Sequence, residues 1–238
     1  MSVRAAGRAA VFIDKDGTLI EDVPFNVDPA LVRFTRHAVE GLRTLDRAGY
    51  AIVLVTNQPG IATGRFSQAD FNALQSALTA MIGMEVGVAL TGFHACPHAP
   101  AADDAPACAC RKPAPGMLLE AARRHGIDLQ RSWMVGDILD DIEAGRRAGC
   151  KTVLLDVGNE TVWRRGPMRE PLYQATDLAD AARLIVQHDA IAAAHDACRK
   201  ADADQRAERL SSPTPSDRRP RPIRPMASTF DRTLRGAS

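Results

Sequence analysis

Short apolar runs alternate with longer amphipathic stretches along most of the chain. Residues 9–13 (AAVFI) and 51–55 (AIVLV) are apolar without interruption, which is typical of strands buried on both faces of a parallel sheet. Between them, residues 37–48 carry apolar side chains at helical spacing and end before Gly49. That pattern predicts an amphipathic helix with a glycine stop.

The alternation continues as far as residue 155. Ser67, followed three residues later by Asp70, predicts the capped start of a second helix. Further strands are predicted at 88–93, 132–135 and 151–155, and further helices at 116–125, at 139–148 and within 177–209. We therefore expect an α/β fold with a doubly wound, mostly parallel sheet and helices on both of its faces.

Composition excludes several classes of protein. The net charge is +1 and aromatic residues make up 5% of the chain, so neither a bias toward nucleic acid nor a base-stacking surface is indicated. No apolar run approaches the roughly 18 residues that a membrane helix needs. The apolar run at 9–13 is too short for a signal peptide. We expect a cytoplasmic protein whose cysteines are reduced and available as metal ligands.

Two carboxylates follow the first predicted strand. Asp14 and Asp16 stand two residues apart, and Gly17 permits a tight turn after them. Paired carboxylates can hold a divalent cation, with one ionised as a nucleophile and the other carrying a proton. A short D-x-D alone is also compatible with a generic acidic turn. Thr56 and Asp137 likewise follow predicted strands, so one crevice at the carboxyl edge of the sheet can collect these side chains.

Four motifs resemble those of the haloacid dehalogenase superfamily of phosphotransferases. The string Asp14-Lys15-Asp16-Gly17-Thr18-Leu19 is similar to the first motif, and Thr56 to the second. Lys112, within Arg111-Lys112-Pro113, is similar to the third. Gly136-Asp137 with Asp141 matches the G-D-x-x-x-D form of the fourth. The four occur in the family's order, and the resemblance covers residues 9 to about 156.

The resemblance implies a magnesium-dependent phosphatase. Asp14 would attack phosphorus and form an aspartyl-phosphate, and Asp16 would act as general acid and then general base. Mg²⁺ would be held by Asp14, Asp137 and the backbone carbonyl of Asp16.

The remaining motif residues would bind the phosphoryl group or support that binding. Thr56 and Lys112 would contact the phosphoryl oxygens, and Asn57 would add an amide donor. Asp141 would orient Lys112 or a metal-bound water. As an alternative, Asp141 is an ordinary acid in the first turn of a helix, a position that Asp140 shares.

A second cluster has the spacing of a zinc site. Cys96 and His98 form a C-x-H pair, and Cys108 and Cys110 form a C-x-C pair on the same loop. Three thiolates and one imidazole complete a tetrahedral Zn²⁺ site with no open position, which is the structural type. Scattered buried cysteines are the alternative. Zinc would fix the neighbouring Arg111 and Lys112 at the rim of the active site.

The strings CPHAP and CACRKPAPGMLLEAA resemble one subgroup of the superfamily with two known activities. One removes the 7-phosphate of D-glycero-D-manno-heptose 1,7-bisphosphate, and the other acts on histidinol phosphate. The long zinc loop and the string TNQPGIATGR at 56–65 favour the heptose activity. A second substrate phosphate needs cationic donors, which Arg111 and Arg65 can supply. Pro59 departs from the pattern, and residues 156–171 match no segment of it.

Composition and the extent of the motifs also predict an organisation for the chain. We expect a phosphatase domain over 1–190 with its zinc loop at 96–110, a helical extension over 191–210 and a disordered basic tail over 211–238. About 34 residues separate the first motif from the second strand, which leaves no room for a large cap domain. A monomer acting on a small phosphorylated molecule is favoured over an oligomer.

Two other functions remain open at this point. The basic tail is compatible with a polynucleotide end phosphatase, although such an enzyme needs a cationic groove in its body. A zinc-stabilised binding module without catalytic activity is the other alternative, and the intact Asp14 and Asp16 argue against it.

Overall fold

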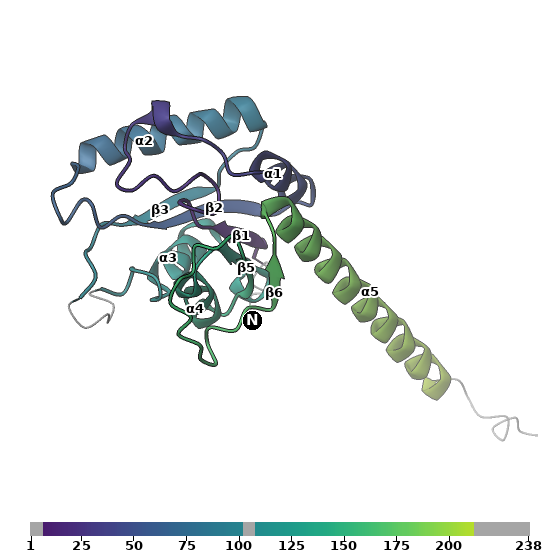
Figure 1. Cartoon of the computed structure of the whole chain (residues 1–238). Helices are drawn as coiled ribbons and strands as arrows, with labels where there is room; N and C mark the ends of the chain where they lie inside the picture. Colours follow the sequence, from purple (N-terminus) through teal and green to yellow (C-terminus); the bar gives the residue numbers. More distant parts are fainter. Residues whose placement is uncertain (1–6, 102–107, 212–238) are drawn as a thin grey trace, which may run out of the picture. The chain divides into compact units, whose positions relative to one another are not determined.

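Six parallel strands form the central sheet, in the order β3-β2-β1-β4-β5-β6 (Figure 1). The structure is a computed structural model that describes residues 7–101 and 108–211. The strands are β1 (Ala10–Ile13), β2 (Ala51–Asn57), β3 (Gly92–Cys96), β4 (Trp133–Gly136), β5 (Lys151–Leu155) and β6 (Tyr173–Ala175). This confirms the predicted α/β class, and every neighbouring pair of strands is parallel.

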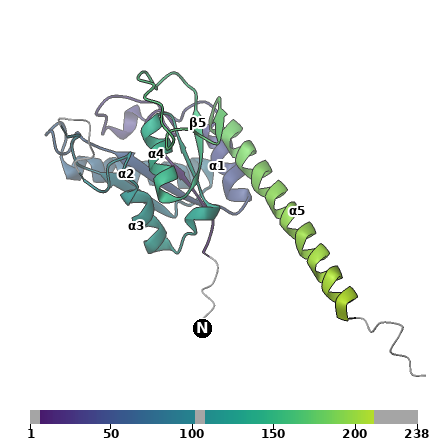
Figure 2. The same cartoon turned by 90° about the horizontal axis from the view of Figure 1, so that it is seen from below.

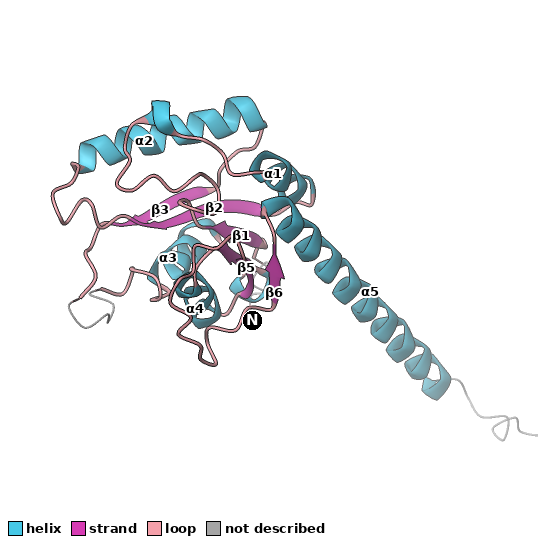
Figure 3. Cartoon of the chain, viewed as in Figure 1, coloured by secondary structure: helices cyan, strands magenta, loops and turns pink. Residues whose placement is uncertain are grey.

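Helices cover both faces of the sheet (Figure 3). Side chains of α1 (Ala38–Arg47) and α2 (Gln68–Met81) share one apolar cluster with Val11 and Ile13 of β1. Side chains of α3 (Gly116–His125) and α4 (Leu139–Ala148) share the other cluster with Ala10 and Phe12. Because successive residues of β1 point to opposite faces, its uninterrupted apolar run fills both cores.

Short helical turns connect several of these elements. They are η1 (Pro29–Leu31), η2 (Ile82–Val86) and η3 (Leu129–Arg131). At the start of α2, the Ser67 side chain accepts a hydrogen bond from the Asp70 backbone N–H, and the Asp70 carboxylate accepts one from the Ser67 backbone N–H. This is the predicted capping box.

Two strands differ from the prediction. The apolar stretch predicted as a strand at 88–93 forms β3 only from Gly92 onward. Val88 and Leu90 instead lie on the connection after η2, where they pack into the core. Their apolar character therefore reflects burial of a loop. Strand β6 has only three residues, too few to leave a pattern in the sequence.

One helix, α5 (Leu178–Ser211), occupies the region predicted as one or two helices. Its first turns bury Leu178, Ala182 and Ile185 in the core, and it begins beside α1 in both views (Figures 1 and 2). The chain divides into two compact units, Met1–Ile191 and Ala192–Ser238. Residues 192–207 are exposed along the helix, and the predicted tail lies outside the described residues after Ser211. None of the described helices is long and apolar enough to cross a membrane.

Candidate active site

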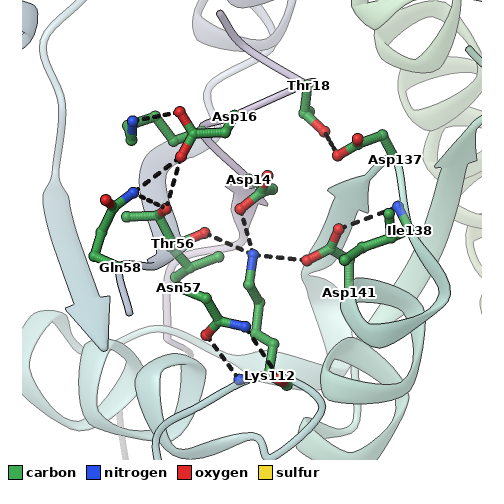
Figure 4. Close-up of polar contacts among 12 residues, drawn as sticks. Asp14, Asp16, Thr18, Thr56, Asn57, Gln58, Lys112, Asp137, Ile138 and Asp141 are labelled. Atoms are coloured by element: carbon green, nitrogen blue, oxygen red, sulfur yellow. Dashed lines mark hydrogen bonds and ion pairs between the residues drawn. The ribbon is translucent and has the colours of Figure 1, made fainter. Parts of the chain in front are cut away.

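The predicted side chains meet at the carboxyl edge of the sheet (Figure 4). Asp14 directly follows β1, Thr56 and Asn57 end β2, and Asp137 directly follows β4. Strands β1 and β4 are neighbours, and the order of the sheet reverses between them. Ligands of open parallel sheets bind in the crevice at such a switch point.

Lys112 lies at the centre of the site. Its ammonium forms ion pairs with Asp14 and with Asp141, the latter at 2.7 Å, and all three side chains are buried. The Lys112 ammonium also donates to the Val55 carbonyl at 3.1 Å. A lysine before a proline is an ordinary surface residue in most sequences. Here two carboxylates from different elements hold it inside the protein.

Asn57 contacts the backbone of Lys112 on both sides. Its Oδ1 accepts from the Lys112 backbone N–H at 3.0 Å, and its Nδ2 donates to the Lys112 carbonyl at 3.1 Å. Both ends of the amide are therefore engaged. The side chain predicted as an amide donor to the phosphoryl group thus also fixes the loop that carries Lys112.

Asp16 is the more accessible of the paired carboxylates, with 28% of its side chain exposed. It forms an ion pair with Lys15 and accepts from Gln58 Nε2 at 2.9 Å and from Thr56 Oγ1 at 3.4 Å. Sequence reasoning did not identify Lys15 or Gln58 as part of the site. Gln58 follows the Thr56-Asn57 pair directly, and that adjacency was the only available signal.

Asp137 receives one hydrogen bond on each carboxylate oxygen. Thr18 Oγ1 donates to Oδ1 at 2.7 Å, and Asn159 Nδ2 donates to Oδ2 at 2.8 Å. Gly17 has φ +81°, and a Cβ there would lie 2.3 Å from Asp137 Oδ2. A glycine is therefore required on steric grounds as well as by its dihedral angle. Asn159 comes from the segment 156–171, which the sequence did not place.

The three buried carboxylates of the site have raised pKa values. Burial raises the pKa of Asp14 to about 7, although the Lys112 ammonium opposes this. Burial raises the pKa of Asp137 and of Asp141 to about 6 each. Burial lowers the pKa of Lys112, but Asp14 and Asp141 raise it by more, so its net shift is upward. One ammonium faces three carboxylates, and a further cation would favour their ionised forms.

The carboxylates are placed to bind such a cation. Asp14, Asp137 and Asp141 each offer an oxygen, and these oxygens all lie within 4.8 Å of one another. Carboxylate oxygens are the ligands that Mg²⁺ prefers. The residues present therefore fit the predicted magnesium site, with Asp141 as an additional neighbour that is already paired with Lys112.

Two adjacent cavities open at this edge. The first, of about 330 Å³, is lined by Asp14, Asp16, Lys112 and the loop 22–26. The second, of about 530 Å³, shares Lys112, Ile138 and Asn159 with the first, and Arg111 is among its lining residues. The Arg65 guanidinium lies over the Phe25 ring, 5.2 Å from its centroid. Phe25 lines the first cavity, and Arg65 is not among the lining residues.

The four predicted zinc ligands converge on one point. The Sγ atoms of Cys96, Cys108 and Cys110 lie 3.1–3.5 Å apart, and His98 Nδ1 lies 3.3 Å from Cys110 Sγ. Tetrahedral zinc with Zn–S bonds of about 2.3 Å separates its ligands by roughly 3.5–3.8 Å. The cluster is therefore close to the size that zinc requires.

The thiols differ in acidity. Burial raises the pKa of Cys96 to about 12. Burial also raises the pKa of Cys108, but hydrogen bonds from the Cys110 thiol and the Arg111 backbone N–H lower it to about 7 overall. Cys108 is therefore the most acidic of the three thiols and the first that can offer a thiolate to a metal.

The fold and the site together define a haloacid dehalogenase-like phosphatase. A family model described as HAD-hydrolase-like matches residues 109–181. D-glycero-β-D-manno-heptose-1,7-bisphosphate 7-phosphatase from Photorhabdus laumondii is 38% identical over 176 residues, which are 72% of this chain and 89% of that protein. The enzyme of the same name from Escherichia coli K12 is 36% identical over 72% of this chain and 86% of its own length.

A solved structure agrees with these relatives. The crystal structure of D,D-heptose 1,7-bisphosphate phosphatase from B. bronchiseptica, complexed with magnesium and phosphate, superimposes with a TM-score of 0.66 at 32% identity. The match covers 76% of this chain and 99% of that one. The chain therefore belongs to the family of HAD-like phosphatases that contains these heptose-bisphosphate enzymes.

Proposed function

We propose that the protein removes the 7-phosphate of D-glycero-D-manno-heptose 1,7-bisphosphate. The observation that carries this proposal is the second cavity, which adjoins the reaction cleft at Lys112 and is lined by Arg111. A bisphosphate can place its reacting phosphate beside Asp14 and its other phosphate near Arg111. Histidinol phosphate, the competing substrate, has one phosphate and leaves this second cavity without an anion. The names of the relatives support the same choice.

Asp14 serves as the nucleophile in the proposed reaction. One of its oxygens attacks phosphorus, the bond to the sugar oxygen breaks, and an aspartyl-phosphate forms. Lys112 is buried against Asp14 and neutralises charge on the phosphoryl oxygens during the transfer, while Thr56 donates to them. In the second step a water oxygen attacks phosphorus and releases Asp14.

Asp16 transfers the protons of both steps. It first gives a proton to the departing sugar oxygen, and it then takes one from the attacking water. Its greater exposure and its position on the wall of the cleft suit this role. Gln58 donates to one carboxylate oxygen at 2.9 Å and so holds the group in place between the two steps, while the single proton of the Thr56 hydroxyl is free to turn from Asp16 to the phosphoryl group.

The proposed magnesium ligands are Asp14, Asp137 and the backbone carbonyl of Asp16. When bound, Mg²⁺ supplies positive charge that offsets the charge of the phosphoryl group and of the carboxylates. The crowding of ionisable carboxylates described above supports this assignment, as does the magnesium in the related B. bronchiseptica structure.

We expect Mg²⁺ to stabilise the protein more at pH 8 than at pH 5.5. The folded-state pKa values of Asp14, Asp137 and Asp141 are raised from 3.8 to about 7, 6 and 6. Their contribution to the stability of the metal-free protein is thus complete below pH 3.8 and lost as the pH rises through 6–7. Mg²⁺ binds the ionised carboxylates, so protons compete with it at low pH. Thermal unfolding with and without Mg²⁺ measures the effect, and an equal rise in Tm at both pH values would contradict it.

The cysteine cluster is proposed to hold one structural Zn²⁺. Four protein ligands leave no open coordination position, so the ion would take no part in the reaction. Cys110 lies two residues before Lys112, and the Cys108 sulfur accepts from the Arg111 backbone N–H at 3.2 Å. Zinc would therefore order the loop that places both Arg111 and Lys112.

Replacing Cys108 by Ser is expected to remove most of the bound zinc and to lower both Tm and kcat/KM. Elemental analysis of the purified wild-type protein should find one zinc per chain. The matched control is Cys198→Ser, because Cys198 is exposed on α5 and should leave the zinc content unchanged. Wild-type protein that lacks zinc and is fully active would contradict the assignment.

Several wider features belong to the same proposal. The cluster requires reduced thiols, which supports a cytoplasmic location. A monomer is the proposed state of the protein. We retain a phosphatase domain over 1–190, an extension over 191–210 and a tail over 211–238 as the proposed organisation. Specificity then depends on short loops at the rim of the cleft, including 22–26, and on the zinc loop.

The reaction can be followed directly by ³¹P NMR with the heptose bisphosphate. We expect one inorganic phosphate per substrate molecule, with the signal of the 1-phosphate unchanged in the product. Loss of the 1-phosphate signal would contradict the proposed position of cleavage. Release of no phosphate from the bisphosphate would contradict the proposed substrate.

A further inference from the structure

The connection between β5 and β6 reaches the proposed magnesium site through two adjacent side chains. Asn159 Nδ2 donates to Asp137 Oδ2 at 2.8 Å. The next residue, Glu160, accepts from the Leu139 backbone N–H at 2.9 Å. Leu139 is the first residue of α4, two positions after Asp137. Both contacts therefore fall on the same turn, where β4 ends and α4 begins.

The Asp137 carboxylate is held on both oxygens. Thr18 donates to Oδ1 from the turn after β1, and Asn159 donates to Oδ2 from the connection after β5. With only the Thr18 contact, a donor would hold Oδ1 alone, and a rotation about the Cβ–Cγ bond would break one hydrogen bond rather than two. With both contacts, the same rotation breaks two. Two donors thus select one orientation of the group that is proposed to bind Mg²⁺.

Gly17 lies so close to both side chains that any other residue at this position would collide with them. A Cβ at Gly17 would lie 2.5 Å from Asn159 Nδ2 as well as 2.3 Å from Asp137 Oδ2. The missing side chain of Gly17 is thus what allows the amide to approach the carboxylate. Gly17 and Asn159 are far apart in the sequence, yet both lie against Asp137 Oδ2.

Glu160 anchors the segment that carries the amide. Helix α4 has no side-chain cap from its own N-cap residue, Ile138. Glu160 takes that place by accepting from Leu139, and its other oxygen accepts from the Val162 backbone N–H at 2.9 Å. A carboxylate at this position also interacts favourably with the helix dipole. The connection is thereby tied to the turn whose carboxylate Asn159 contacts.

We propose that Asn159 is a positioning residue for Asp137 and that its amide increases the affinity of the site for Mg²⁺. The inference rests on the magnesium role proposed above for Asp137. A neutral amide donates a hydrogen bond without adding a charge, so it orders the carboxylate without competing with the cation. Partners of metal ligands typically contribute about 10- to 100-fold in metal affinity.

The test is Mg²⁺ binding measured by titration calorimetry in the absence of substrate. Asn159→Ala should bind Mg²⁺ at least about tenfold more weakly than wild type. The Asn159 side chain is exposed, so truncation leaves the core intact, and an unchanged Tm in the metal-free state checks this. Activity should then require more Mg²⁺ for half-saturation, and kcat at saturating Mg²⁺ should recover most of its wild-type value.

Two further variants separate the amide contact from other effects. Asn72→Ala removes an exposed asparagine of α2 whose amide oxygen accepts from Gln68, and it should bind Mg²⁺ as wild type does. Glu160→Ala loosens the segment but leaves the Asn159 amide in place, so its loss of affinity should be smaller than that of Asn159→Ala. If Glu160→Ala and Asn159→Ala lost equal affinity for Mg²⁺, the assignment to the Asn159 amide would be overturned.

The outcomes also separate this inference from the proposed function. Wild-type protein that binds no Mg²⁺ would refute the magnesium site itself. Wild-type protein that binds Mg²⁺ with the same affinity as Asn159→Ala would refute the positioning role alone. Neither measurement depends on which phosphorylated sugar is the substrate.

Discussion

Asp14→Asn should lower kcat by at least about four orders of magnitude, because it removes the atom that forms the bond to phosphorus. The amide is close in size to the carboxylate and retains an oxygen that can accept from Lys112. Burial also disfavours the ionised form of Asp14, so a neutral amide does not add a desolvation penalty. The variant should therefore fold and unfold at a Tm no lower than that of the metal-free wild type.

Phosphate release by purified Asp14→Asn measures this effect, and circular dichroism and thermal unfolding verify the fold. Asp156→Asn is the matched control. Asp156 directly follows β5 and is exposed, so it shares the strand-end position of Asp14 without lining either cavity. Near-normal turnover by a folded Asp14→Asn protein would refute the covalent mechanism.

Asp16→Asn should lower kcat for the sugar substrate by about 10²–10⁴-fold, the range expected for loss of a general acid and base. Its effect should depend on the leaving group. An aryl phosphate such as p-nitrophenyl phosphate releases a stable phenolate that needs no proton. The first step should therefore proceed with this substrate, while the second step, which requires activation of water, should remain slow.

A rapid-mixing experiment with p-nitrophenyl phosphate distinguishes the two steps. Asp16→Asn should release about one equivalent of nitrophenolate per active site and then turn over slowly, because the aspartyl-phosphate accumulates. Asp156→Asn should show wild-type steady-state turnover. A steady rate for Asp16→Asn that is equal to wild type with both substrates would show that Asp16 transfers no proton in either step.

Much of the fold was predictable because it depends on local patterns. The apolar runs of β1 and β2 fill both cores, and such runs are visible in the sequence. The strand-end positions of Asp14, Thr56 and Asp137 also predicted that they meet, since parallel strands end at one edge. Strand β3 was misplaced because Val88 and Leu90 are apolar for burial in a connection, and apolar character alone does not separate the two cases.

The contacts that hold the site residues in place were harder to predict from the sequence. Lys112 could be placed only by its resemblance to a family motif, because its two carboxylate partners come from distant elements. Asn159 gave no signal, since its contact with Asp137 depends on the path of the folded chain rather than on any local period. Lys15 pairs with its sequence neighbour Asp16, and no role was predicted for it. Asn57 was predicted as a donor to phosphate, and the sequence did not indicate that its amide also holds the Lys112 backbone through its oxygen and one N–H.

The role of Arg65 also could not be settled from the sequence. The structure places its guanidinium over Phe25, which lines the first cavity, and its contact with a second phosphate stays a prediction. The arginine can therefore affect the substrate through the position of that ring. Arg111, by contrast, lines the second cavity and keeps its proposed role.

The central claim is that this phosphatase acts on a heptose bisphosphate and not on histidinol phosphate. The most direct test is the ratio of kcat/KM for D-glycero-D-manno-heptose 1,7-bisphosphate to that for histidinol phosphate, measured with the same Mg²⁺-loaded protein. A second phosphate that pairs with a cationic group contributes about 1.5–3 kcal/mol, so we predict a ratio of at least about tenfold in favour of the bisphosphate. A ratio below one, with histidinol phosphate preferred, would contradict the assignment.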